Sequence, residues 1–190
     1  MGGEDVMQGN ISEAIKSLDF IFENTPIKVV ANRNCPAITL PGVTLGPFEE
    51  GNEYNLQFWV AREMEKSGVT HFHNDEIIDE AKLYKIHWTE RVQKIGKASA
   101  LPENFYPKLR RYLENLKEEI VKRPEKLREY EKSSHMTKDI LNVRLKKIIS
   151  LSSGPAQIEQ TLKNFTKEER VLYESLYQII NEWKKTMVEY

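Results

Sequence analysis

The chain has 190 residues, of which 30% are charged, and its formal net charge is −1. A chain of this length can bury a hydrophobic core as one domain or as two small ones. The near-neutral balance excludes a general electrostatic attraction to nucleic acid or to an anionic membrane, and no apolar run approaches the ~20 residues that a membrane-spanning helix needs.

Charge is distributed unevenly along the sequence. Residues 1–81 hold 5 basic and 14 acidic residues, a net charge of −9, whereas residues 82–150 hold 18 basic and 9 acidic residues, a net charge of +9. Mixed, solvent-exposed helix faces can explain such a fluctuation without any partner. The alternative is a basic surface that meets an acidic partner or a phosphate backbone. Its candidate residues are Arg110, Arg111, Lys146 and Lys147.

Cysteine content and the N-terminal sequence indicate the compartment. Cys35 is the only cysteine, so no disulfide can form within the chain, which is typical of a protein in a reducing compartment. The N-terminal residues do not show the basic and then apolar pattern of a secretory signal. We therefore expect a cytoplasmic protein without a membrane partner.

The first part of the sequence predicts one helix and three short strands. The helix follows from apolar residues at helical spacing, namely Ile11, Ile15, Leu18 and Phe22, although 18–22 could instead begin a strand. Short β-branched segments at 27–31, 37–40 and 43–45 are separated by Asn, Pro and Gly turns. Because one helix and three short strands bury little surface, we expect this part to pack against other helices or another chain.

The segment Thr44–Arg62 predicts a hinge between strands and helices. The Gly46-Pro47-Phe48 sequence predicts a rigid corner, because Gly permits φ angles that other residues resist and Pro fixes φ. After Gly51, apolar residues at helical spacing predict an amphipathic helix, namely Leu56, Trp59, Val60 and Met64. We therefore expect an α+β, mainly α protein, with a small β-rich domain at 1–49 and an α-helical domain at 50–190. The predicted hinge residues are Gly46, Pro47, Phe48, Gly51 and Trp59.

Helical patterns continue to the end of the sequence. A helix that starts at Asn74 or Asp75 is predicted to turn one stripe inward, namely Ile77, Ala81, Tyr84, Trp88, Val92 and Ile95. The next helix spans 104–121 and has Pro107 in its first turn. The polar segment 122–134 predicts an exposed linker, in which one solvated helical turn could form, after which Thr137 caps a further helix.

The last helix is the predicted subunit interface. Thr166 and Glu169 form a capping-box pattern in front of it. Its apolar surface is wider than one core-facing stripe needs, although all of its aromatics could instead be core. A helix that is apolar over more than one face is typical of contact with a second subunit, where Tyr and Trp are favoured. The candidate interface residues are Tyr173, Leu176, Tyr177, Ile180, Trp183 and Met187.

Catalytic and metal-binding patterns are scarce. The sequence contains no phosphate-binding loop, dinucleotide fingerprint, nucleophile elbow or zinc-protease motif. His71 and His73 could chelate a metal if a third ligand came from elsewhere, but a polar loop that caps the following helix explains them as well. We therefore expect no catalytic residue, no cofactor and no metal. An enzyme that uses His71 and His73 stays the alternative.

One resemblance supports a binding role. A strand, the Gly46-Pro47-Phe48 corner, Gly51 and a helix with Trp59 and Ala61 follow one another in this order. This order resembles subunits of the GINS replication complex in which a small β-domain precedes a helical domain, as in the archaeal small subunit and its two eukaryotic counterparts. The resemblance extends from about Phe20 to Leu151. The eukaryotic pattern has more apolar residues before the first helix, where this chain has Asn52, Glu53 and Tyr54.

The resemblance implies a function and a set of partners. It implies a non-catalytic subunit that forms a 2:2 heterotetramer with its paralogue and bridges the MCM helicase and a RecJ-like protein during DNA replication. Primase and DNA polymerase are further candidate partners, and direct contact with DNA is left open. The implied location is the chromosome, within the nucleus if the source is eukaryotic. A helical adaptor unrelated to replication is the other alternative.

Overall fold

The computed structural model describes residues 4–40, 42–93, 98–155 and 162–188. The chain forms two compact units: a small unit, Asp19–Ile77, and a helical unit, Met1–Leu18 with Ile78–Tyr190. One division lies within the first helix, α1 (Glu4–Glu23), and the other follows Ile77. The expected boundary after Glu49 therefore falls inside the small unit.

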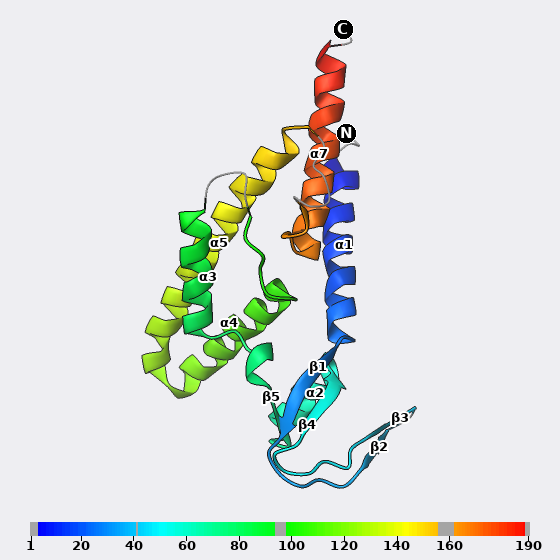
Figure 1. Ribbon diagram of the computed structural model, residues 1–190, viewed down its shortest axis with the longest axis vertical. Coiled ribbons are helices and arrows are strands. Elements are labelled where there is room, and N and C mark those ends of the chain that lie inside the picture. Colours follow the sequence, from blue (N-terminus) through cyan, green and yellow to red (C-terminus); the bar gives the residue numbers. More distant parts are fainter. Residues whose placement is uncertain (1–3, 41, 94–97, 156–161, 189–190) are drawn as a thin grey trace. The chain divides into compact units, whose positions relative to one another are not determined.

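The small unit is built around a three-stranded antiparallel sheet in the order β4-β1-β5 (Figure 1). Its strands and helices are β1 (Pro26–Ala31), β2 (Ile38–Leu40), β3 (Val43–Leu45), β4 (Glu53–Gln57), α2 (Phe58–Lys66), β5 (Thr70–Phe72) and the 3-10 helix η1 (Asn74–Glu76). In β1, every second side chain is buried, namely Ile27, Val29 and Ala31, as the two-residue repeat of a strand requires. The strands β2 and β3 form a separate hairpin.

Aromatic side chains fill the core of the small unit. Phe58 at the start of α2 lies 4.4 Å from the ring of Phe22 and 5.8 Å from that of Phe72. Phe48 is buried edge-on against Tyr54, at 4.9 Å between ring centroids, and its backbone pairs with Cys35 at the base of the hairpin. The core of this unit is thus assembled from α1, the sheet, α2 and the Phe48 corner.

The corner at Gly46 and Pro47 is as tight as the sequence predicts. Gly46 has φ +80°, and the peptide bond to Pro47 is cis. A Cβ atom at Gly46 would lie 2.9 Å from the ring of Phe48, so a side chain there would displace the buried ring. Gly51, with φ +82°, makes a second turn.

Two predictions about the segment Thr44–Arg62 are wrong. Leu56 belongs to strand β4 and pairs with Ile27, so the helix begins only at Phe58. The mixed polarity of Glu53–Gln57 is compatible with a helix or a strand. Pairing with strand β1 stabilises the strand. The whole segment also lies inside the small unit, so it is not a hinge between the two units. Within it, Trp59 is 38% exposed.

Among the described residues, the helical unit contains the N-terminal part of α1 and four long helices. These elements, with the 3-10 turn η2, are α3 (Glu80–Val92), α4 (Phe105–Lys122), η2 (Pro124–Lys126), α5 (Leu127–Ser152) and α7 (Lys167–Val188). Helix α5 packs against α3, α4 and α7 and is therefore the central helix (Figure 1). One core cluster joins α3, α4 and α5 through Leu83, Phe105 and Ile140, and another joins α5 and α7 through Ile148 and Tyr173.

Several expectations for this unit are confirmed. Helix α4 closely matches the predicted 104–121, and Pro107 lies in its first turn. The capping box is formed: the backbone N–H of Glu169 donates to Thr166 Oγ1 at 3.3 Å, and that of Thr166 donates to Glu169 Oε2 at 3.0 Å. The predicted class, an α+β and mainly α chain with a helical bundle after a small strand region, is also confirmed.

Other boundaries differ from the prediction. The expected linker 122–134 forms η2 and the first two turns of α5, and Thr137 is a buried residue within α5 rather than its cap. Tyr112 on α4 explains why this polar stretch is ordered, because its hydroxyl lies 3.3 Å from Glu129 and 3.1 Å from Ser133. Helix α3 is capped by Asp79, whose carboxylate accepts from the Lys82 N–H at 2.7 Å, and not by Asn74 or Asp75.

Candidate protein–protein interface

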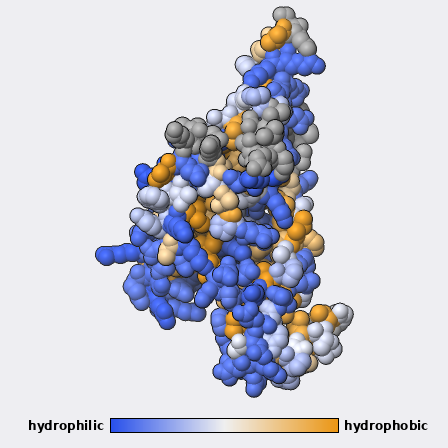
Figure 2. Space-filling view, viewed as in Figure 1, coloured by the Kyte–Doolittle hydropathy of each residue, from blue (hydrophilic) through white to orange (hydrophobic). Residues whose placement is uncertain are grey.

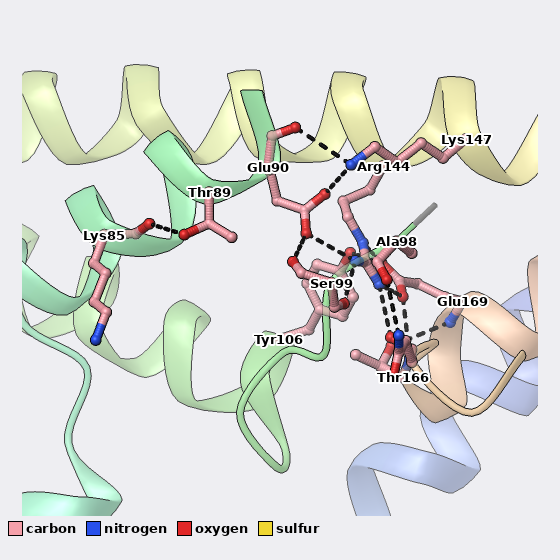
Figure 3. Close-up of polar contacts among 11 residues, drawn as sticks. Lys85, Thr89, Glu90, Ala98, Ser99, Tyr106, Arg144, Lys147, Thr166 and Glu169 are labelled. Carbon is pink, nitrogen blue, oxygen red and sulfur yellow. Dashed lines mark hydrogen bonds and ion pairs between the residues drawn. The ribbon is translucent and has the colours of Figure 1, made fainter. Parts of the chain in front are cut away.

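A buried network of charged side chains holds the helical unit together. Arg144 on α5 lies between Glu90 of α3 and Glu169 of α7, and all three side chains are almost fully buried (Figure 3). Its Nη1 donates to Glu90 at 3.0 Å and its Nε donates to Glu169 at 2.8 Å. Lys147 supplies a second cation, 2.7 Å from Glu90. The two carboxylates and two cations balance in charge.

The guanidinium of Arg144 is fully hydrogen-bonded. Besides the two carboxylates, it donates to the backbone carbonyls of Ser99 at 2.8 Å and Asn164 at 3.1 Å. With the second bond to Glu169, all five N–H groups of the side chain have acceptors. A buried charge is tolerated only with such complete pairing. The network therefore fixes α3, α5 and α7, with the segments beside Ser99 and Asn164, in one arrangement.

The network shifts the pKa values of Tyr106, Glu90 and Arg144. Burial raises the pKa of Tyr106, and the negative charge of Glu169, to which its hydroxyl donates at 2.6 Å, raises it further. Burial also raises the pKa of Glu90, but hydrogen bonds from Lys147 and Ser99 and the charge of Arg144 outweigh it, so this pKa lies below its ordinary value near 4.5. The carboxylate form of Glu90 is thus favoured at neutral pH.

Stability should depend on the ionisation of Glu90. Because the pKa of Glu90 is lower in the folded chain than near 4.5, its contribution is complete above about pH 4.5 and is lost as the pH falls through the lower folded-state value. We expect Glu90→Gln to be less stable than the wild type at pH 7, and the difference to narrow below pH 4.5. Chemical denaturation from pH 7 to pH 3 measures this difference. If the difference in unfolding free energy between the wild type and Glu90→Gln stayed constant from pH 7 to pH 3, the pKa of Glu90 would not be lowered by folding.

The predicted interface residues of α7 divide into a buried and an exposed set. Tyr173 is only 5% exposed and packs against Phe165 and Tyr177, so it belongs to the core of this chain. Leu176, Tyr177 and Ile180 are half-buried. Trp183 and Met187 are 61% and 56% exposed.

We call the last turns of α7, residues Ile179–Val188, the α7 end. Every residue from Glu182 to Val188 is exposed, and Figures 1 and 2 show this part of the helix extending past its neighbours with apolar atoms at its surface. Lys184 Nζ donates to the backbone carbonyl of Ser153 at 2.7 Å, which ties the middle of the α7 end to the carboxyl end of α5. The α7 end thus presents Trp183 and Met187 on an anchored helix.

Helix α3 exposes the stripe that the sequence predicted to face inward. Tyr84, Trp88 and Val92 are 55%, 58% and 63% exposed; Ile95 lies outside the described residues. The buried side of α3 instead carries Leu83 and Glu90. The hydrophobic pattern predicts that charged residues of a helix face water, and Glu90 does not. Glu90 can be buried because Arg144 and Lys147 neutralise its charge. The sequence pattern predicted neither this surface nor the buried network, because the cations that allow Glu90 to face inward lie on another helix.

The four basic residues predicted to form one surface do not do so. Lys147 is buried in the network, so its assignment to a contact surface is wrong. Arg110 and Lys146 are exposed, and Arg111 is half-buried. Arg110 lies at a cavity of about 320 Å³ whose apolar lining comes from α1, α5 and α7, namely Ile11, Ile15, Leu141, Leu145, Ile148 and Leu172.

The two histidines suggested for a metal are held by other polar groups. His71 on β5 contacts the side-chain oxygen of Asn32, and His73 lies 3.7 Å from Glu53 and 3.4 Å from Asp75. Within the described ranges, no three His, Cys, Asp or Glu residues come together as a set of metal ligands. The absence of a bound metal stays a prediction.

Comparison with protein families agrees with the two-unit structure. Residues 77–188 match the model of the GINS complex protein helical bundle domain, which covers more than half of the chain, and residues 14–71 match that of the PSF2 N-terminal domain. This chain belongs to the GINS family. A search of curated proteins found no match.

The family assignment confirms the resemblance found in the sequence. As a GINS protein, the chain is a subunit of a complex that acts in DNA replication, and it associates with other GINS subunits. Neither matched family is a catalytic domain. In the described part of this GINS chain, no helix is long and apolar enough to cross a membrane. The helical-bundle match begins at residue 77, which is where the small unit of the structure ends.

Proposed function

We propose that the chain is a non-catalytic GINS subunit that forms a 2:2 heterotetramer with a paralogous subunit and, in that complex, activates the replicative MCM helicase. Matches to two GINS-type domains in one chain support this proposal. A RecJ-like protein is the second partner that the complex bridges to the helicase, with primase and DNA polymerase as further candidates. The proposed location is the chromosome.

The observation that carries the assembly part of this proposal is the α7 end. Exposed Trp and Met side chains are enriched at protein interfaces, where Trp is a frequent energetic anchor. Trp183 and Met187 lie one turn apart on a helix that the Lys184–Ser153 contact holds in place. Ile179 and Ile180 continue the same stripe toward the bundle as half-buried residues. A partner helix laid along this stripe would remove the exposed apolar side chains from water.

The test is assembly with a co-expressed paralogous subunit. We expect Trp183→Ala with Met187→Ala to lower the affinity between subunits by at least ~25-fold, because truncation of a central interface Trp typically costs about 2 kcal/mol or more. Light scattering over a concentration series measures the mass of the complex and its dissociation.

The matched control is Gln178→Ala with Lys185→Ala. Both residues are exposed on α7 and lie on roughly the opposite side of the helix from Trp183. The control should keep the wild-type mass, and circular dichroism should show unchanged helix content in both variants. A Trp183 and Met187 variant that assembles as tightly as the control would remove the α7 end from the interface. Failure of the wild type to assemble with any paralogue would overturn the proposed function.

A further inference from the structure

The exposed side of α3 forms a surface with a regular chemical order, which we call the α3 face. Successive residues of an α-helix are rotated by about 100° around its axis. This rotation places a row of apolar residues, the spine, in the middle of the exposed side and one cationic residue at each edge. Tyr84, Trp88 and Val92 are the exposed large residues of the spine, and Ala81 is exposed beside them. Arg91 borders Tyr84 at one edge, and Lys85 borders Val92 at the other; the full set is Ala81, Tyr84, Lys85, Trp88, Arg91 and Val92.

Carboxylates on and around α3 are already engaged within the chain. Glu90, the only carboxylate between Ala81 and Val92, is buried with Arg144 and Lys147. Glu80 pairs with Lys132 at 2.6 Å, and Asp139 on α5 pairs with His87 at 3.1 Å. By contrast, the described part of the chain offers no ion pair to Lys85 or Arg91. The hydrogen bond from His87 and, to a lesser extent, the charge of Arg91 lower the pKa of Asp139, which His135 also contacts. Arg91 therefore shares this carboxylate with two histidines, and both edges of the α3 face keep positive charge.

We propose that the α3 face docks a helix of a partner protein whose apolar stripe is edged by carboxylates on both sides. Apolar residues in the centre and cations at both edges are complementary to that pattern. Tyr, Trp and Arg are also the residues that most often anchor interfaces. This surface is on a different helix from the α7 end, so the inference goes beyond the proposed assembly.

A second copy of this chain does not supply the complementary helix. The α7 end carries Lys184 next to Trp183, so the α3 face would meet a like charge there. Single-stranded DNA fits less well than a helix. Ala81 and Val92 offer no ring on which a base could stack.

The test uses two fluorescein-labelled peptides of about 20 residues, long enough to be helical in water. Both carry leucines at i, i+4, i+7 and i+11; one has Glu at both edges of this stripe and the other has Lys. Fluorescence anisotropy measures binding to the full chain, alone and in its complex with the paralogous subunit. An oligo(dT) of 20 nucleotides is measured beside them. We expect the Glu-edged peptide to bind at least ~10-fold more tightly than the Lys-edged peptide or the oligonucleotide.

Variants locate the contact and test its charge. Trp88→Ala should weaken binding of the Glu-edged peptide by at least ~25-fold. Lys85→Glu with Arg91→Glu should reverse the preference toward the Lys-edged peptide. Lys146→Glu with Lys167→Glu changes the net charge equally on other exposed positions and should keep the wild-type preference. Circular dichroism confirms the fold of each variant.

Three results would overturn the inference. The first is no binding of the Glu-edged peptide at 1 mM, or equal binding of both peptides, because the face would then lack charge-selective docking. The second is oligonucleotide binding that is tighter and depends on Trp88, which would assign the face to single-stranded DNA. The third is binding to the isolated chain but not to the assembled complex, which would make the α3 face a contact between GINS subunits.

Discussion

Arg144→Met should lower the free energy of unfolding of the helical unit by about 3–5 kcal/mol, because removal of one partner leaves buried charges uncompensated. Glu169 would lose both of its bonds to the guanidinium, and Glu90 would keep only Lys147 and Ser99. The backbone carbonyls of Ser99 and Asn164 would also lose a donor. Because whole domains are stable by only about 5–15 kcal/mol, thermal unfolding followed by circular dichroism should show a large fall in Tm.

Arg128→Met is the matched control, because Arg128 is exposed on the same helix. Surface substitutions of this kind usually change stability by less than about 0.5 kcal/mol. If Arg144→Met were as stable as Arg128→Met, the network would not be needed for the packing of α3, α5 and α7. Methionine keeps much of the volume of the side chain, so a large effect would come from charge and hydrogen bonding rather than from a cavity.

Phe48→Ala should destabilise the small unit by about 3–5 kcal/mol, the usual cost of truncating a buried phenylalanine to alanine. Phe48 contacts Tyr54 edge-on, and its backbone is bonded to Cys35 in both directions, at 2.9 and 2.8 Å. Loss of the ring should therefore loosen the hairpin base and strand β4 together. Since a chain of two units need not unfold in one step, residue-resolved hydrogen exchange is the suitable measurement.

Trp59→Ala is the control within the same unit. Much of the Trp59 side chain already contacts water, and its indole N–H bonds only to the exposed Gln57 side chain, at 2.9 Å. We expect a cost of about 1 kcal/mol. Exchange in β1 and β4 should rise strongly in Phe48→Ala and little in Trp59→Ala, while α4 and α5 keep their protection in both. Equal effects of the two substitutions would place the core of the small unit elsewhere than at the Phe48 corner.

Local signals in the sequence were sufficient for the elements whose residues satisfy one another nearby. Thr166 and Glu169 are three residues apart and bond to each other's backbone, so the start of α7 is readable from four residues. Helix α4 has a clear apolar stripe with few competing residues, and the Gly46 corner depends on the φ preferences of two residues. Each of these features is decided by energies that act within one or two turns of chain.

Local sequence patterns did not predict the features that depend on residues far apart in the chain. Strand β4 follows from pairing with β1, about half of the small unit away in sequence, and the polar start of α5 follows from contacts with Tyr112 on α4. A local window contains neither partner. The hydrophobic pattern predicts that a segment has an apolar face, but the choice between helix and strand, or between linker and helix, was made by the element on which that face packs.

Helix α3 illustrates the division most clearly. Its sequence by itself determined a helix with an apolar stripe through Tyr84, Trp88 and Val92. Only the tertiary structure decided that this stripe faces outward, because Glu90 on the other side is buried between Arg144 and Lys147. A buried carboxylate is stable only when cations neutralise it, and these cations lie more than 50 residues further along the chain. The same long-range ion pair that completes the core thus leaves two aromatic side chains of α3 on the surface.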